Sequence, residues 1–411
     1  MAIILPFKAL RPQAQFAKQV ASRPYDVLNS KEAKEEVRGN PFSFLHITKP
    51  EIDLPEGTHL YDDAVYAKAK ENLQAFIQRD VLFVENKPCY YIYRLIMNGH
   101  SQTGLVSTSS VKDYEKDVIK KHEFTRPEKE NDRIQHMKVC GAQTGNVFLA
   151  YRDVTELNQL IDKWQTEKSP IYDFTAEDEV QHTLWIVNDD TLIEQISQIF
   201  KLQVPCTYIA DGHHRAASAA KVKAAMGKEA PLSAGSFLTT LFPASQLKIM
   251  DYNRVIKDLN GYSADELIKK LSEDFDIKEE NHNPVKPESL HQFGMYIAGN
   301  WYRLTTRDGR FDPAHPIESL DVSILSKLVL EKHLGIMDQR TDHRIDFVGG
   351  IRGLGELQKR VDSGEMQLAF SLYPVTMEQL FAVADSGEVM PPKSTWFEPK
   401  LRDGLLTHIL S

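Results

Sequence analysis

The chain has 411 residues, a net charge of −9, and 42% hydrophobic and 26% charged residues. This composition is typical of a soluble globular protein, excludes extended disorder, and suits two or three domains. The negative charge also argues against a basic surface that attracts nucleic acid or an anionic membrane.

The first eighty residues predict short strands and helices. The strands are expected at residues 3–5 and 42–48, and the helices at residues 15–22, 31–38 and 63–79. Asn29 or Ser30 can cap the helix over residues 31–38. This helix carries Glu32, Glu35 and Glu36, which an exposed charged helix would also explain.

A predicted hairpin and a charged segment follow. Residues 89–97 and 103–107 are β-rich, and the polar residues 98–102 between them predict the connection. Residues 114–133 predict a helix interrupted by Pro127, whose mixed charges fit a solvated helix with ion pairs between successive turns. Within it, residues 122–126 read His-Glu-Phe-Thr-Arg and are a candidate binding segment.

Strands and helices then alternate, which predicts a mixed α/β core. The expected strands are residues 146–151, 183–187, 207–210 and 236–242, and the expected helices are residues 191–200 and 213–226.

The turn between residues 207–210 and the next helix is the main candidate site. Asp211 and Gly212 form the turn, and His213, His214 and Arg215 lie in the first helical turn. Backbone N–H groups, the positive end of the helix dipole and a guanidinium would then meet in one place suited to phosphate. The alternative is a plain strand-to-helix turn in which Asp211 caps the helix and Arg215 is a surface charge.

The character of the sequence changes after residue 255, and a domain boundary is expected within residues 255–290. We therefore divide the chain into residues 1–260 and 261–411. Helices are predicted at residues 264–273, 320–334, 356–361 and 377–384, a hairpin at 295–306 and a strand at 368–372. No G-x-x-x-x-G-K-S/T pattern occurs, which argues against a P-loop.

A proline-stiffened loop near the C-terminus is a second candidate anion site. Pro391 and Pro392 precede Lys393, Ser394 and Thr395, which together offer a cation, two hydroxyls and N–H donors. A tail that packs through its aromatic residues is an equal alternative.

The cysteines and the apolar runs indicate a cytoplasmic protein. Cys89, Cys140 and Cys206 are far apart, form no C-x-x-C pair, and fit reduced thiols better than a disulfide framework. The apolar start of the chain is too short for a signal peptide, and no run approaches a membrane span.

Five separated motifs resemble the bacterial and archaeal family of domain of unknown function 1015. They are PFKALRP at residues 6–12, PYDV at 24–27, HEFTRP at 122–127, DGHHR at 211–215 and PPKSTWF at 391–397. The DGHHR turn is also similar to the phosphate-binding turn of the ParB/sulfiredoxin-like fold, in which archaeal free-serine kinases carry D-G-H-x-R. His213 takes the place of the cysteine of sulfiredoxin, so that resemblance implies no thiol chemistry here.

The resemblance implies a fold and a nucleotide site. The fold is a mixed α+β protein with a ParB/sulfiredoxin-like core, a large insertion at about residues 27–203, and a C-terminal α+β domain that contributes a loop to the site. Gly212, His213, His214 and Arg215 are expected at the phosphates, with Lys393, Ser394 and Thr395 as a second clamp.

The implied activity is an ATP- and Mg²⁺-dependent kinase that converts free L-serine to O-phosphoserine. Asp211, His214 and an N-terminal carboxylate are the expected catalytic groups; we choose Glu36 over Glu32 and Glu35, with Asp26 as an alternative. His122, Glu123, Thr125 and Arg126 are expected to bind serine or the nucleotide. No spacing identifies metal ligands.

Two other functions remain open at this stage. One is a regulator that binds a nucleotide at the same turn without transferring phosphate. The other is DNA binding in the manner of ParB, which the negative charge and the absence of a basic helix-turn-helix disfavour.

Overall fold

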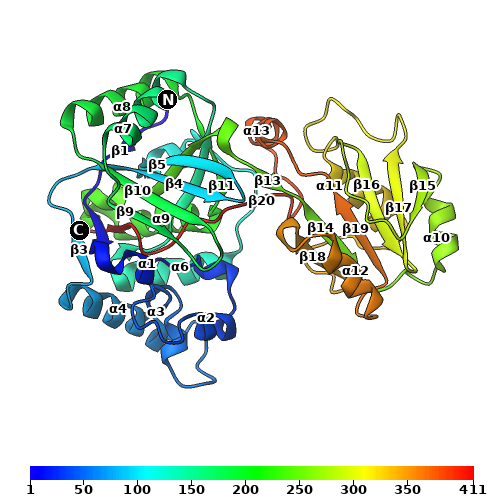
Figure 1. Cartoon of the computed structure of the whole chain (residues 1–411), viewed down its shortest axis with the longest axis horizontal. Helices are drawn as coiled ribbons and strands as arrows, with labels where there is room; N and C mark the ends of the chain where they lie inside the picture. The colour runs from blue at the N-terminus through cyan, green and yellow to red at the C-terminus, as the bar shows by residue number, and fades with distance from the viewer. The chain divides into compact units, whose positions relative to one another are not determined.

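The computed structural model describes residues 1–411 and divides into two compact units. Unit 1 comprises Met1–Leu247 and Pro399–Ser411, and unit 2 comprises Lys248–Glu398. The sequence-based division at residue 260 therefore differs from the observed one, chiefly because the chain end returns to unit 1. There β21 (Thr407–Ile409), in the red segment of Figure 1, pairs with strands near the N-terminus and in the middle of the chain.

Unit 1 is built on a nine-stranded sheet with the order β6-β11-β8-β12-β5-β4-β10-β9, and β1 pairs with β5. The β11–β6 and β12–β8 pairs are parallel and the other pairs are antiparallel. The strands are β1 (Ile4–Leu5), β4 (Tyr90–Met97), β5 (His100–Ser110), β6 (Ile119–Lys120), β8 (Val147–Tyr151), β9 (Tyr172–Thr175), β10 (Gln181–Val187), β11 (Thr207–Asp211) and β12 (Ser236–Pro243). A four-stranded sheet contains β2 (Ala9–Pro12), β3 (Leu82–Val84), β7 (Ala142–Gln143) and β21.

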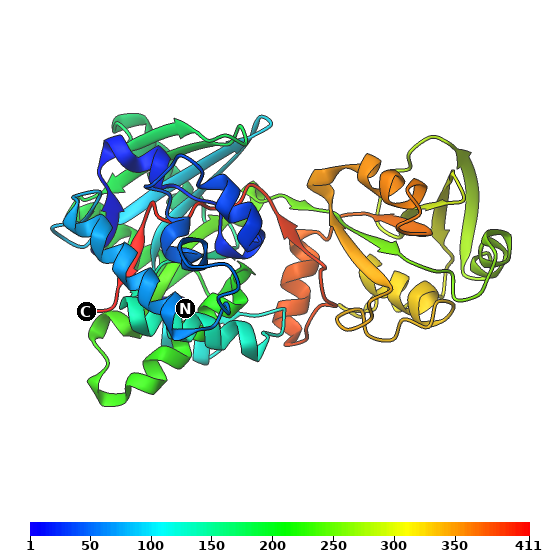
Figure 2. The ribbon, with the colours of Figure 1, turned by 90° about the horizontal axis from the view of Figure 1, so that it is seen from below.

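Helices pack against these sheets, and α6 contacts both α9 and α4. The N-terminal helices, drawn in blue, lie on the side of unit 1 that faces the viewer in Figure 2. The helices are α1 (Ala17–Val20), α2 (Ser30–Glu36), α3 (Leu45–Thr48), α4 (Asp63–Gln78), α5 (Val111–Glu115), α6 (Pro127–Cys140), α7 (Thr155–Glu167), α8 (Asp190–Gln203) and α9 (His213–Met226).

Two predicted elements of unit 1 are wrong. Residues 42–48 contain α3 rather than a strand, and Phe44, Leu45 and Ile47 are buried by helical packing. Residues 114–133 do not form an interrupted helix, because Pro127 begins α6 instead of breaking it. Proline is favoured in the first helical turn, where its missing N–H has no partner to lose.

Unit 2 is a six-stranded antiparallel sheet with the order β15-β17-β16-β19-β14-β18. Its strands are β14 (Tyr252–Ile256), β15 (Phe275–Asn281), β16 (Gln292–Ile297), β17 (Asn300–Thr306), β18 (Ile345–Gly349) and β19 (Leu368–Leu372), with β13 (Ile249–Met250) and β20 (Trp396–Phe397) paired separately. Its helices are α10 (Ala264–Leu271), α11 (Asp321–Leu325), which continues as a π-helix over Ser326–Glu331, α12 (Leu354–Asp362) and α13 (Met377–Ser386).

The chain is a mixed α+β protein, as predicted. Both units contain antiparallel strand pairs together with helices, and unit 1 adds parallel pairs at β8 and β11. No helix has both the length and the apolar character needed to cross a membrane.

Candidate functional site

The β11–α9 turn has the predicted form. β11 ends at Asp211, Gly212 has φ 98°, and α9 begins at His213. A side chain at Gly212 would place its Cβ 3.2 Å from Cζ of Arg215 and 3.3 Å from Cα of Val147, so both the backbone conformation and the space favour glycine. No side chain caps α9. The N–H groups of its first turn and the positive end of its dipole are therefore available to an anion.

Arg215 lies beneath this turn and is held by carboxylates. Its Nη2 is 3.4 Å from Oδ2 of Asp26 and 3.6 Å from Oδ2 of Asp211, and its Nη1 donates to the carbonyl of Asn146. Burial lowers the pKa of Arg215, but the two carboxylates outweigh burial and raise it. Arg215 was predicted to contact phosphate directly; the structure places it as a buried support of the turn, 6% exposed.

Asp211 also pairs with a lysine from the end of the chain. Lys400 Nζ donates to Oδ2 of Asp211 at 3.1 Å. Burial would raise the pKa of Asp211, but Lys400 and Arg215 hold it well below its usual range. Asp211 is therefore a carboxylate at neutral pH, and its charge is already balanced by two cations.

Asp403 is a further carboxyl group near Arg215, and it was not identified from the sequence. Its side chain is buried, and its Oδ2 has no hydrogen-bond partner. Burial, with a smaller contribution from the charge of Asp26, raises the pKa of Asp403 to about 7 against the opposing charge of Arg215. No motif marks this residue, because only the folding of the chain end into unit 1 brings it near Arg215.

The segment 122–126 meets the first turn of α9. The rings of His122 and His213 are 4.6 Å apart between centroids and nearly perpendicular. Oε2 of Glu123 lies 3.9 Å from Nδ1 of His213, and the N–H of Arg126 donates to Nε2 of His214 at 2.9 Å. The two sequence motifs proposed for the nucleotide and the substrate are therefore in contact with each other.

The three imidazoles of this site have lowered pKa values. Burial lowers the pKa of His122 to about 4, and burial together with His122 holds the pKa of His213 well below its ordinary value. Burial also lowers the pKa of His214. Nδ1 of His122 and Nε2 of His213 are buried without hydrogen-bond partners. At neutral pH these groups act as hydrogen-bonding imidazoles rather than as cations.

The N-terminal carboxylates have different positions. Glu32 forms a capping box with Asn29 at the start of α2. Glu35 pairs with Arg38, and Glu36 pairs with Arg23. Asp26, held near Arg215, is thus the one of the four candidates that has a contact with the turn residues.

Thr125 has a local role, because its hydroxyl donates to Glu130. Lys393, Ser394 and Thr395 belong to unit 2. Ser394 donates its hydroxyl to the carbonyl of Pro391 at 2.6 Å, and Nζ of Lys393 lies 5.6 Å from the ring centroid of Tyr252. Their proposed joint action with the turn stays a prediction.

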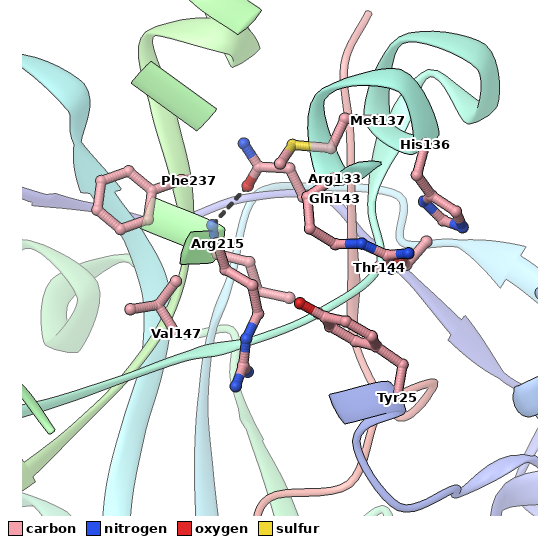
Figure 3. Close-up of a pocket in the computed structure, with 11 residues that line it drawn as sticks. Tyr25, Arg133, His136, Met137, Gln143, Thr144, Val147, Arg215 and Phe237 are labelled. Atoms are coloured by element: carbon pink, nitrogen blue, oxygen red, sulfur yellow. Dashed lines mark hydrogen bonds between the residues drawn. The ribbon is translucent and has the colours of Figure 1, made fainter. Parts of the chain in front are cut away.

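A small cavity lies beneath the turn. It measures about 20 Å³, enough for about one water molecule. Figure 3 shows the side chains of Tyr25, Arg133 and Arg215 around it, and Cζ of Arg133 stacks 3.9 Å from the Tyr25 ring centroid. This cavity is too small for a nucleotide.

No group of three or more His, Cys, Asp or Glu side chains is arranged to hold a metal ion. Two carboxylates at the turn, those of Asp26 and Asp211, already contact Arg215.

Comparison with known proteins gives a family and several distant structures. Residues 4–323 match the family described as "Protein of unknown function (DUF1015)", and no curated protein matches the sequence. A free serine kinase in complex with AMP is 15% identical, with a TM-score of 0.35, over 70% of this chain and 89% of that one. A conserved hypothetical protein from Pyrococcus furiosus is 16% identical, with a TM-score of 0.36, over 71% of this chain and 91% of that one. SbnI with a C-terminal truncation from Staphylococcus aureus is 12% identical, with a TM-score of 0.37, over 72% of this chain and 85% of that one.

Proposed function

The chain belongs to the DUF1015 family, and we propose that it is an ATP-dependent kinase that phosphorylates the hydroxyl of free L-serine. One observation carries the proposal: the uncapped first turn of α9 meets both the segment 122–126 and the carboxylate of Asp26. Phosphoryl transfer requires an anion cradle, an acceptor site and a carboxylate near the acceptor hydroxyl. The resemblance of the DGHHR motif to free-serine kinases supports serine as the acceptor.

The nucleotide phosphates are assigned to the turn itself. The backbone N–H groups of His213 and His214 and the dipole of α9 supply the cradle. Nε2 of His214 accepts a hydrogen bond from Arg126, so the neutral ring carries its proton on Nδ1 and can donate it to a phosphate oxygen. Gly212 keeps the approach open, and Arg215 fixes the turn from below.

Asp26 is the proposed base, in preference to Glu36. Serine Oγ attacks the terminal phosphorus of ATP, the bond from that phosphorus to the bridging oxygen breaks, ADP leaves, and the hydroxyl proton passes to Asp26. Mg²⁺ would enter with the nucleotide, and the carboxylate of Asp211 would supply it with an oxygen ligand of the kind it prefers.

Serine is assigned to the exposed side of the segment 122–126. Glu123 can pair with the ammonium group and Arg126 with the carboxylate. His122 is 2% exposed and packs behind His213, so its proposed role is to support that ring rather than to bind serine directly.

The test is turnover by the purified chain with ATP, Mg²⁺ and L-serine, with phosphoserine measured by mass spectrometry. We expect serine-dependent ADP release, and a loss of about 10²-fold or more in kcat for Asp26→Asn. Glu36→Gln is the matched control and should retain activity.

If ADP does not accumulate in a serine-dependent way, the kinase proposal fails. Binding of ATP without turnover, lost in His214→Ala, would then support the nucleotide-binding regulator. If Glu36→Gln abolishes turnover and Asp26→Asn does not, the assignment of the base is reversed.

A further inference from the structure

Arg254 is a buried cation without an acidic partner. It lies in β14 of unit 2, is 0% exposed, and forms no ion pair. Its Nη1 donates to the carbonyl of Tyr252 and its Nη2 to the carbonyl of Pro392 at 3.3 Å, while Nε has no partner. Burial lowers the pKa of Arg254 to about 10. A guanidinium has five N–H donors, so two carbonyls leave most of its capacity unused in a desolvated place.

The surroundings of Arg254 explain why no carboxylate reaches it. Its strand neighbours in the sheet are Phe347 of β18 and Phe370 of β19, and its Cζ lies 5.2 Å from the Phe347 ring centroid. Asn253, the preceding residue, points to the opposite face of the sheet, where its side-chain amide donates to Oδ2 of Asp251 at 2.6 Å. The acidic group nearest in sequence is therefore bonded on the other side of the strand.

A second cation lies on the loop that covers Arg254. Lys393 directly follows Pro392, is exposed, and has no ion pair, and its Nζ lies over the Tyr252 ring. Its φ of 57° is in the left-handed region, where a lysine is strained. Ser394 holds the loop through its bond to Pro391.

We propose that unit 2 binds a phosphate group between the guanidinium of Arg254 and the ammonium of Lys393. A phosphate oxygen would replace the carbonyl of Pro392, whose bond to Nη2 is long, and would use the free Nε–H in a bidentate contact. Binding requires the loop of residues 391–395 to move aside and then close on the anion. All groups of this site belong to unit 2, so it can be tested separately from the kinase reaction proposed for the turn in unit 1.

Hydrogen exchange of the full chain, measured by mass spectrometry with and without inorganic phosphate at constant ionic strength, tests the proposal. We expect the peptide covering residues 390–398 to exchange about tenfold more slowly when phosphate is present at about ten times its Kd. Acetate at the same ionic strength should have little effect, because a single carboxylate carries less charge.

Variants separate this site from the turn in unit 1. Lys393→Ala changes an exposed residue and should abolish the protection by phosphate without unfolding the protein. Arg254→Lys keeps the positive charge but removes the bidentate guanidinium, and it should also abolish the protection. Lys286→Ala, at another exposed lysine of unit 2, and Asp26→Asn should both retain it. The proposal is overturned if phosphate leaves residues 390–398 unchanged in the wild type, or if the protection persists in Lys393→Ala.

Discussion

Arg215 in unit 1 and Arg254 in unit 2 are both buried arginines beside a turn, but their environments differ. Arg215 contacts Asp26 and Asp211, with Asp403 close by, and these carboxylates raise its pKa. Arg254 contacts two carbonyls and aromatic rings, and burial lowers its pKa. In unit 1 the buried charge is neutralised within the protein; in unit 2 it is not.

This difference assigns different tasks to the two residues. Two carboxylates already balance the charge of Arg215, so its proposed role is to fix the geometry of the turn, and anion binding is assigned to the N–H groups of α9. Arg254 has no acidic partner, so some of its N–H donors remain available to an anion. A cation in a motif therefore indicates an anion site only after its existing partners have been identified.

The largest expected effect separates the two arginines directly. Arg215→Met leaves Asp26, Asp211 and Asp403 without their shared cation, and should destabilise unit 1 by about 3–5 kcal/mol. Arg254→Met removes a buried charge that has no acidic partner, keeps most of the volume, and should change the stability of unit 2 by about 2 kcal/mol or less in either direction. Native-state hydrogen exchange of β8 and β19 reports each unit separately.

Equal losses in the two variants would contradict this comparison. They would show that the carbonyl bonds of Arg254 stabilise unit 2 as strongly as the carboxylates stabilise unit 1 through Arg215.

The next effect concerns the carboxyl group of Asp403. Its pKa of about 7 in the folded state lies above the ordinary value near 4, so between these pH values the folded protein holds a proton that the unfolded chain has lost. This stabilisation is complete below pH 4 and disappears as the pH rises to 7. Asp403→Asn removes it, so the stability of the variant relative to the wild type should rise by about 2–4 kcal/mol between pH 4 and 7.

Urea unfolding of both proteins across this pH range gives the measurement. His122 and His213 titrate with the opposite sign, because their pKa values are lowered, but they are present in both proteins and cancel in the difference. A difference that stays constant from pH 4 to 7 would show that Asp403 ionises normally and that Arg215 neutralises it fully.

A smaller effect is expected at the turn glycine. Gly212→Ala combines a positive φ with contacts to Arg215 and Val147, and should cost about 1–3 kcal/mol. Gly141→Ala is the matched control in the same unit, since Gly141 has φ 63° and open space around its Cα. Denaturant unfolding should show the larger loss for Gly212→Ala. Equal losses would mean that Arg215 moves aside easily and is not a rigid support.

The elements that the sequence predicted well are those whose signals are local. The β4–β5 hairpin has turn residues Asn98 and Gly99 between two β-rich runs, and α2 has its capping box. The prediction of a strand at residues 42–48 was wrong because the apolar pattern was too short to separate a strand from a buried helical turn. Pro127 was taken as an interruption although the same residue favours a helix start.

The site was predicted in part for the same reason. The β11–α9 turn depends on consecutive residues, and its form is confirmed. Other groups at the turn depend on the return of residues 399–411 to unit 1, which brings Lys400 to Asp211 and Asp403 near Arg215. The sequence also does not indicate that Arg254 has no acidic partner. The absence of a partner follows from the directions in which neighbouring side chains of the sheet point.

The smallest expected effect is at Lys393. Lys393→Gly relieves the strain of the left-handed backbone at this residue, which is worth about 1–2 kcal/mol. The substitution also increases the conformational entropy of the unfolded chain, which costs about 0.5–1 kcal/mol of stability. We therefore expect unit 2 to become more stable by up to about 1 kcal/mol. Lys286→Gly has no such strain to relieve and should lose about 0.5–1 kcal/mol. Hydrogen exchange of β16 and β19 measures both changes.

If Lys393→Gly loses as much stability as Lys286→Gly, the contact of Lys393 with the Tyr252 ring offsets the backbone strain in the free protein. In that case the loop of residues 391–395 is stable without an anion, and of the two cations of the proposed phosphate site only Arg254 would still favour anion binding.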